Sequence, residues 1–266
     1  MLRALVVIVA LTGNVAAETE AARVDAMVDG LPELAKLSRG RTRVTVHGAV
    51  ARAKQRAVVS VADQVITDVA RRFTAKTGSP HAEIRLCLLS DDTTYREAAG
   101  AFEGTLPSEW GFYRADLRVA IANLGASIGN LRHELVHPLI GDDFPRIPAW
   151  LNEGIAALYG TAKWNGKQFQ FLVNYRLRDL QRAIKAGTLP TIAELAASTN
   201  DDVRGDRAMT FYAMSRYVLL FVEQQGKLTE LYADLRGAKD RAAHAAILAG
   251  YVDEPKFLAW AKKLRR

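Results

Sequence analysis

Apolar residues recur at helical spacing over several stretches of the chain. Residues 52–76 predict an amphipathic helix, because their apolar positions are three or four residues apart. These positions are Val58, Val61, Val65, Val69 and Phe73. Two further stripes, 173–184 and 211–221, end before Gly187 and Gly226, which can cap helices. Residues 253–266 predict a terminal helix, so we expect the second half of the chain to be mainly α-helical.

The first half carries strand patterns instead. Residues 41–48 alternate polar and apolar positions, and residues 81–89 form an apolar run. Residues 110–125 predict a hairpin with its turn near Asp116 and residues 118–123 as the returning strand. A short helix capped by Ser90 or Asp91 precedes the hairpin. The fold class is therefore expected to be α+β, with a small mixed sheet in residues 18–160 and an α-helical subdomain in residues 161–266.

Two helices are predicted where these halves meet. One begins near Ser127 and ends around Gly141, and the other follows Pro148 and runs to about Leu158. Within the first helix, Pro138 predicts a kink, because its ring would clash with the carbonyl group of Glu134.

The first of these helices carries two histidines at metal-binding spacing. His133 and His137 are four residues apart, which places them about 40° apart on one helical face. Neutral imidazole is a common zinc ligand. Glu134 follows the first histidine, where a carboxylate can act as a general base beside the metal. The alternative is that this spacing arose by chance in a protein with five histidines.

Glu153 favours the metal interpretation. Fifteen residues separate it from His137, which is enough for a turn and a return helix. Catalytic zinc sites usually have three protein ligands and one open position. Small residues next to it, at positions 154, 156 and 157, allow two helices to approach closely. Alone, Glu153 would be an ordinary acidic residue near a helix N-terminus. Together with the histidine pair it predicts one Zn²⁺ per chain.

The order His-Glu-x-x-His followed by Trp-Leu-Asn-Glu-Gly resembles the gluzincin class of zinc metallopeptidases, and most of all its peptidase-MA-like families of exported bacterial proteins. The resemblance is strong over residues 110–160 and weaker over 211–226 and 256–260. It implies a zincin-like fold and zinc held by His133, His137 and Glu153. It also implies that Glu134 is the catalytic base. The family's acid one turn after the metal glutamate is here Ala157, so Asp142 and Asp143 are considered as supports for the ligands.

A peptide hydrolase of this kind also needs an oxyanion donor and a surface for its substrate. We expect Tyr212 to be the donor, since residues 211–218 resemble the tyrosine-bearing helix of related families; the alternative is a core aromatic residue. Tyr113 and Tyr159 are weaker candidates. The strand 118–123 could pair with an extended peptide, with Ala120 and Asn123 as contacts. Trp150 is expected to pack beneath the site.

The N-terminus and composition suggest where such an enzyme acts. Arg3, the apolar residues 4–11 and small residues before Glu18 predict a secretory signal peptide, residues 1–17, cleaved near Ala17. We therefore expect a periplasmic or extracellular protein without stable membrane insertion. Its single cysteine, Cys87, lies in an apolar strand and excludes an intramolecular disulfide. A net charge of +7 favours attraction to anionic envelope polymers, but no nucleic-acid-binding motif is present.

Three functions stay open at this point. The first is a zinc-dependent peptidase acting on a peptide or protein. The second is a non-catalytic exported envelope protein with a structural zinc site, although such a site has no need of Glu134. The third is a metal-free helical binding protein that uses its basic surface.

Overall fold

The computed structural model describes residues 20–74, 81–104, 106, 108–202 and 205–266. Its main sheet is mixed, which fits the expected α+β class. In spatial order the strands are β1 (Glu33–Arg39), β2 (Thr42–Ala49), β3 (Ile84–Leu89), β5 (Val119–Asn123) and β4 (Gly111–Arg114). The three central strands are parallel, and the two edge strands, β1 and β4, are each antiparallel to their neighbour.

Helices cover both faces of this sheet. The alternation of side chains along a strand divides β3, with Leu86 and Leu88 facing one core and Cys87 and Leu89 the other. The first core contains α2 (Arg52–Arg72), the helix predicted by the valine stripe. The second contains the helical residues 20–29 and α3 (Asp92–Ala99), which Asp91 caps by accepting a hydrogen bond from the Thr94 amide.

The two helices predicted at the boundary are α4 (Ile128–Asp143) and α5 (Ala149–Gly160). The Ser127 side chain caps α4, and the helix continues through Pro138 to Asp143. The two helices approach closely because both lack side chains at the contact: a Cβ atom at Gly129 would collide with the carbonyl oxygen of Gly160. This close approach fixes the position of one helix relative to the other.

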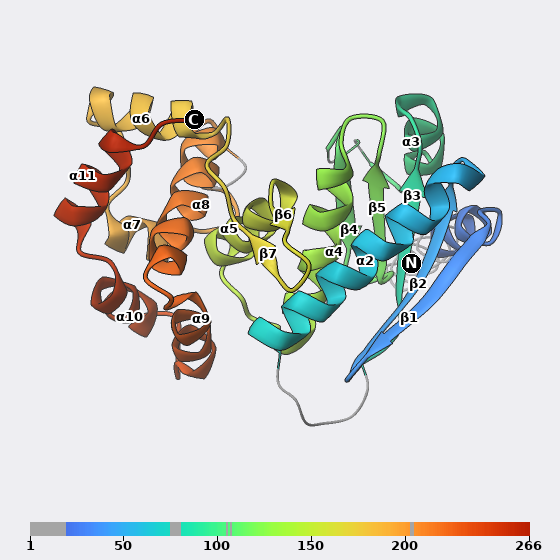
Figure 1. Cartoon of the computed structure of the whole chain (residues 1–266), viewed down its shortest axis with the longest axis horizontal. Helices are drawn as coiled ribbons and strands as arrows, with labels where there is room; N and C mark the ends of the chain where they lie inside the picture. Colours follow the sequence, from blue (N-terminus) through green and yellow to red (C-terminus); the bar gives the residue numbers. More distant parts are fainter. Residues whose placement is uncertain (1–19, 75–80, 105, 107, 203–204) are drawn as a thin grey trace, which may run out of the picture.

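The remainder of the chain is mainly helical. After a small ribbon of β6 (Lys163–Trp164) and β7 (Phe169–Gln170), the structure contains α6 (Leu177–Ala186), α7 (Ile192–Ala197), α8 (Ala208–Gln224), α9 (Leu228–Gly237), α10 (Ala243–Tyr251) and α11 (Glu254–Lys263). Figure 1 shows the sheet on the right, these later helices on the left, and α4 and α5 between them. One apolar core runs continuously from the sheet to α11.

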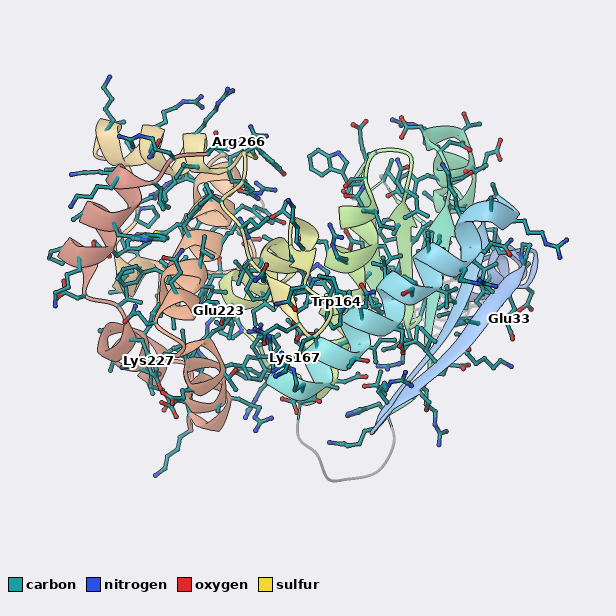
Figure 2. All side chains as sticks on the ribbon, in the orientation of Figure 1. Glu33, Trp164, Lys167, Glu223, Lys227 and Arg266 are labelled. Atoms are coloured by element: carbon teal, nitrogen blue, oxygen red, sulfur yellow. The ribbon has the colours of Figure 1, made fainter. Side chains whose placement is uncertain are left out.

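A buried ionic network joins the two sides of this core. Asp68 of α2 is fully buried and accepts hydrogen bonds from Arg71, Arg72 and the Tyr159 hydroxyl. Arg72 also donates to Glu223 of α8, at 2.7 Å; Figure 2 labels Glu223 on the helical side of the molecule. The network therefore links α2, α5 and α8 through charged groups that all have partners.

The predicted signal peptide, residues 1–17, lies outside the described residues. Among the helices of the described part, none combines the length and the apolar character needed to cross a membrane.

Candidate metal centre

The structure brings the three predicted ligands together. His133 and His137 project from α4 and Glu153 from α5, and one potential ligand atom of each lies within 4.8 Å of the others. The Nε2 atom of His133 is 3.4 Å from Oε2 of Glu153. All three side chains are partly buried: His133 is 23% exposed, Glu153 21% and His137 11%. The close packing of α4 on α5 produces this convergence.

Gly154, the residue after Glu153, allows α5 to pack closely against α8. A Cβ atom at Gly154 would come within 2.7 Å of Leu219 Cδ1 and 3.1 Å of the Ser215 carbonyl oxygen, both on α8. Glycine therefore lets α5 pack directly against α8, while the neighbouring Glu153 faces α4. This arrangement agrees with the expectation that small residues allow close helix packing here.

Glu134 lies beside the three ligands. It is 5% exposed, and its Oε2 atom is 4.0 Å from Nε2 of His137. Burial raises the pKa of Glu134, although the neighbouring His133 and His137 oppose this effect. A raised pKa suits a carboxylate that must accept a proton and later release it.

The predicted ligands shift one another's pKa values because their side chains lie close together. Burial alone would raise the pKa of Glu153, but the histidines and the Tyr212 hydroxyl outweigh it and lower that pKa to about 2. Burial opposes the charged form of His133, yet Glu153 and Glu134 raise its pKa overall. Glu153 is therefore ionised at neutral pH, as a metal ligand must be.

One orphaned atom tests whether these residues fit a metal ion. Oε2 of Glu153 is buried and forms no hydrogen bond of normal geometry among the described residues, although Nε2 of His133 lies 3.4 Å away. A buried carboxylate oxygen without a partner is costly, and a cation between it and the two imidazoles would satisfy it. Two imidazole nitrogens and one carboxylate oxygen form a donor set typical of catalytic zinc, so the residues fit that ion.

Asn152 supports the site in a way that the sequence did not reveal. Its Oδ1 atom lies 3.0 Å from Nδ1 of His137. With the proton on Nδ1, His137 donates to Asn152 and keeps Nε2 free for a metal, which is the usual arrangement of a ligand histidine. The two aspartates considered for this role are engaged elsewhere: Asp142 pairs with Arg118, and Asp143 with Arg236. The observed partner of His137 is Asn152, so we assign the support of this ligand to Asn152 and not to the two aspartates.

Tyr212 reaches the site from α8. Burial raises the pKa of Tyr212, and the interaction of its hydroxyl with the Glu153 carboxylate raises it further. The structure thus places Tyr212 next to a ligand, while its role as an oxyanion donor stays a prediction. The other tyrosines are used differently, because Tyr159 donates to Asp68 and Tyr113 lies in the hairpin. Trp150 is fully buried, as expected of a supporting residue.

The proposed substrate contacts on strand 118–123 are wrong. This strand, β5, is flanked by β3 and β4, so it has no free edge for a peptide. Ala120 and Asn123 are fully buried. Asn123 instead fixes the connection to α4: its side-chain oxygen accepts from the Gly125 amide, and its carbonyl accepts from the Asn130 side chain. Of the two hairpin strands, β4 is the one at the edge of the sheet.

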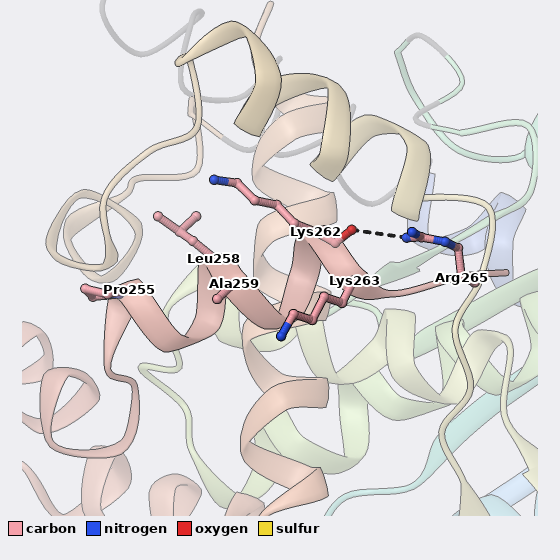
Figure 3. Close-up of a pocket in the computed structure, with 6 residues that line it drawn as sticks. All are labelled: Pro255, Leu258, Ala259, Lys262, Lys263 and Arg265. Carbon is pink, nitrogen blue, oxygen red and sulfur yellow. Dashed lines mark hydrogen bonds between the residues drawn. The ribbon is translucent and has the colours of Figure 1, made fainter.

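A pocket is present in the C-terminal segment, far along the chain from the metal cluster. It is lined by Pro255, Leu258, Ala259, Lys262, Lys263 and Arg265 of the C-terminal segment. Figure 3 shows Arg265 bonded to the Lys262 carbonyl oxygen, at 3.1 Å, and no metal ligand among the lining residues. We therefore assign it no part in the metal centre.

Comparison of the sequence with models of protein families gave no match, and comparison with curated proteins gave none either.

Proposed function

We propose that this protein is a zinc-dependent peptide-bond hydrolase of the gluzincin type with a zincin-like fold. The proposal rests on the arrangement of four side chains. His133, His137 and Glu153 bring their ligand atoms together, and the carboxylate of Glu134 lies beside them without being needed as a ligand. A structural zinc site has no use for this fourth, buried carboxylate. For that reason we favour the peptidase over the non-catalytic envelope protein.

Each residue has a defined task in this scheme. Zinc bound by the three ligands would act as a Lewis acid that polarises a carbonyl group and acidifies water. Glu134 accepts a proton from the attacking water and delivers it to the leaving nitrogen. Asn152 holds the His137 ring in place. Tyr212 is proposed to donate a hydrogen bond to the developing oxyanion, from its position beside Glu153.

The substrate is proposed to pair with β4. The Asn123 amide donates to the Trp110 carbonyl oxygen, and hydrogen bonding along an antiparallel strand alternates in direction. Gly111 and Tyr113 therefore direct their backbone groups away from β5, towards the free edge. Gly111 also borders the base, because a Cβ atom there would lie 2.6 Å from Cγ of Glu134. A peptide extended along β4 would pass Glu134.

Glu134→Gln provides the decisive test. The variant should keep its zinc and lose at least about a hundredfold in peptide hydrolysis, since the base is removed without altering the ligands. Glu97→Gln, on the exposed side of α3, is the matched control and should behave as wild type. Full activity in zinc-loaded Glu134→Gln would refute the mechanism. A large loss of thermal stability on chelation, without turnover of any peptide, would favour the structural-zinc alternative.

We further propose that the protein acts outside the cytoplasm, on a peptide or protein. The sequence of residues 1–17 and the net charge of +7 support this, the latter through attraction to anionic envelope polymers.

A further inference from the structure

An arginine next to the metal centre lacks the partners that arginines usually have. Arg176 precedes α6, and its central guanidinium carbon lies 5.0 Å from the ring centroid of Tyr212 and 5.4 Å from that of Tyr175. Its Nη1 atom is buried and has no hydrogen-bond partner among the described residues. Both rings lie within cation–π distance of the guanidinium, and neither supplies a carboxylate or carbonyl acceptor for its N–H groups.

The other buried arginines of the described part make a clear contrast. Arg72 binds the carboxylates of Asp68 and Glu223, and Arg216 donates to two carbonyl oxygens and the Thr161 hydroxyl. Nε of Arg216 also lacks a partner, but both of its terminal nitrogens donate, so the contacts of Arg72 and Arg216 explain their structural roles. A buried N–H group without an acceptor destabilises the folded state, so Arg176 is not explained in this way.

Arg176 lies close enough to the metal centre to influence its residues electrostatically. The positive charge of Arg176 acts to lower the pKa of His133 and the pKa of Tyr212. Tyr212 in turn interacts with Glu153. Arg176 is half-buried and the neighbouring Tyr175 is 48% exposed, so this part of the chain lies near the protein surface. An anionic group bound there would lie beside Tyr212, which interacts with the proposed ligand Glu153.

We propose that Arg176 binds a carboxylate of the peptide substrate beside the metal centre. A guanidinium presents N–H groups in a planar fork that matches the two oxygens of a carboxylate. The proposal deepens the proposed function and rests on it. The carboxylate is either the C-terminus of the peptide or an Asp or Glu side chain near the cleaved bond.

Matched peptides separate these sources and test the proposal. One pair differs only in a C-terminal carboxylate or amide, and a second pair, amidated throughout, differs only in Glu or Gln within two residues of the cleaved bond. Arg176→Gln should lower kcat/KM for the preferred carboxylate peptide by about tenfold to a hundredfold, the effect of losing a charged hydrogen bond. It should leave the neutral partner within about twofold. Arg178→Gln, on the exposed side of α6, is the control and should change neither.

Arg176→Lys keeps the charge without the fork and should lie between wild type and Arg176→Gln. Equal losses on the carboxylate and neutral peptides would overturn the proposal, because they would indicate a structural effect. If wild type hydrolyses no peptide, the proposed function fails, and binding of the same peptides to zinc-loaded Glu134→Gln still decides the role of Arg176. Equal affinity of that protein for all four peptides would then refute it.

Discussion

Asn152→Ala tests whether α5 holds the metal-binding histidine His137 of α4 in position. The substitution removes the acceptor 3.0 Å from Nδ1 of His137, whose side chain is 11% exposed. The imidazole then loses the bond that fixes its ring and its tautomer. Loss of such a supporting group weakens metal binding by about 10- to 100-fold. That range corresponds to about 1.4 to 2.7 kcal/mol of binding free energy.

The measurement is the dissociation constant of zinc at pH 7, obtained by competition with a chromophoric chelator. Asn152→Asp keeps an acceptor oxygen and should bind zinc at least as tightly as wild type. Asp142→Asn is the matched control, because Asp142 pairs with Arg118 and not with a ligand. If Asn152→Ala binds zinc within about twofold of wild type, the hydrogen bond to His137 does not organise the site, and the reasoning is refuted.

Three further predictions follow from single contacts. Gly111→Ala should reduce hydrolysis while zinc content is unchanged, because the added Cβ atom would lie 2.6 Å from Glu134 Cγ and 2.7 Å from the Ile121 carbonyl oxygen; unchanged kcat would show that β4 does not constrain the base. Asp68→Ala should lower the free energy of unfolding in urea by about 2–4 kcal/mol, since Arg72 loses one of its two carboxylate partners and the Tyr159 hydroxyl loses its acceptor. Asp25→Ala, which removes a surface pair with Arg85, should cost less than about 1 kcal/mol. Burial raises the pKa of the Cys87 thiol to about 12. The folded state then holds its proton more tightly than the unfolded state, so stability should fall as the pH rises from about 9 to 12, and Cys87→Ala should lack that part of the fall in thermal melting experiments.

Elements with a buried face could be predicted from the sequence. The valine stripe of α2 and the apolar run of β3 record burial directly, and both elements form where expected. The edge strand β1 could not be recognised in the same way. Its seven residues, 33–39, are exposed or half-buried throughout, so they carry no apolar periodicity. Its position depends on pairing with β2 across a tight turn.

The candidate site shows the same limit. Ligand spacing on one helix is local, so His133 and His137 were found from their separation alone. The strand order could not be predicted in this way. It depends on the pairing of β5 with β3, which joins residues more than thirty positions apart and determines which hairpin strand lies at the edge. Asn152 belongs to the Trp-Leu-Asn-Glu-Gly motif, but nothing in the sequence indicates its partner, and Arg176 carries no sequence signal of its own. Their roles depend on which side chains of α4 and α8 they meet in the folded protein.

The zinc content of the purified protein tests the central claim most directly. Elemental analysis of chain purified without chelators should find about one zinc per chain in wild type and in Glu134→Gln, because Glu134 is not a ligand. His137→Ala and Glu153→Ala should each lose most of it. Absence of zinc from the wild-type protein, or retention of full zinc content by both ligand variants, would contradict the assignment of His133, His137 and Glu153 as a metal centre.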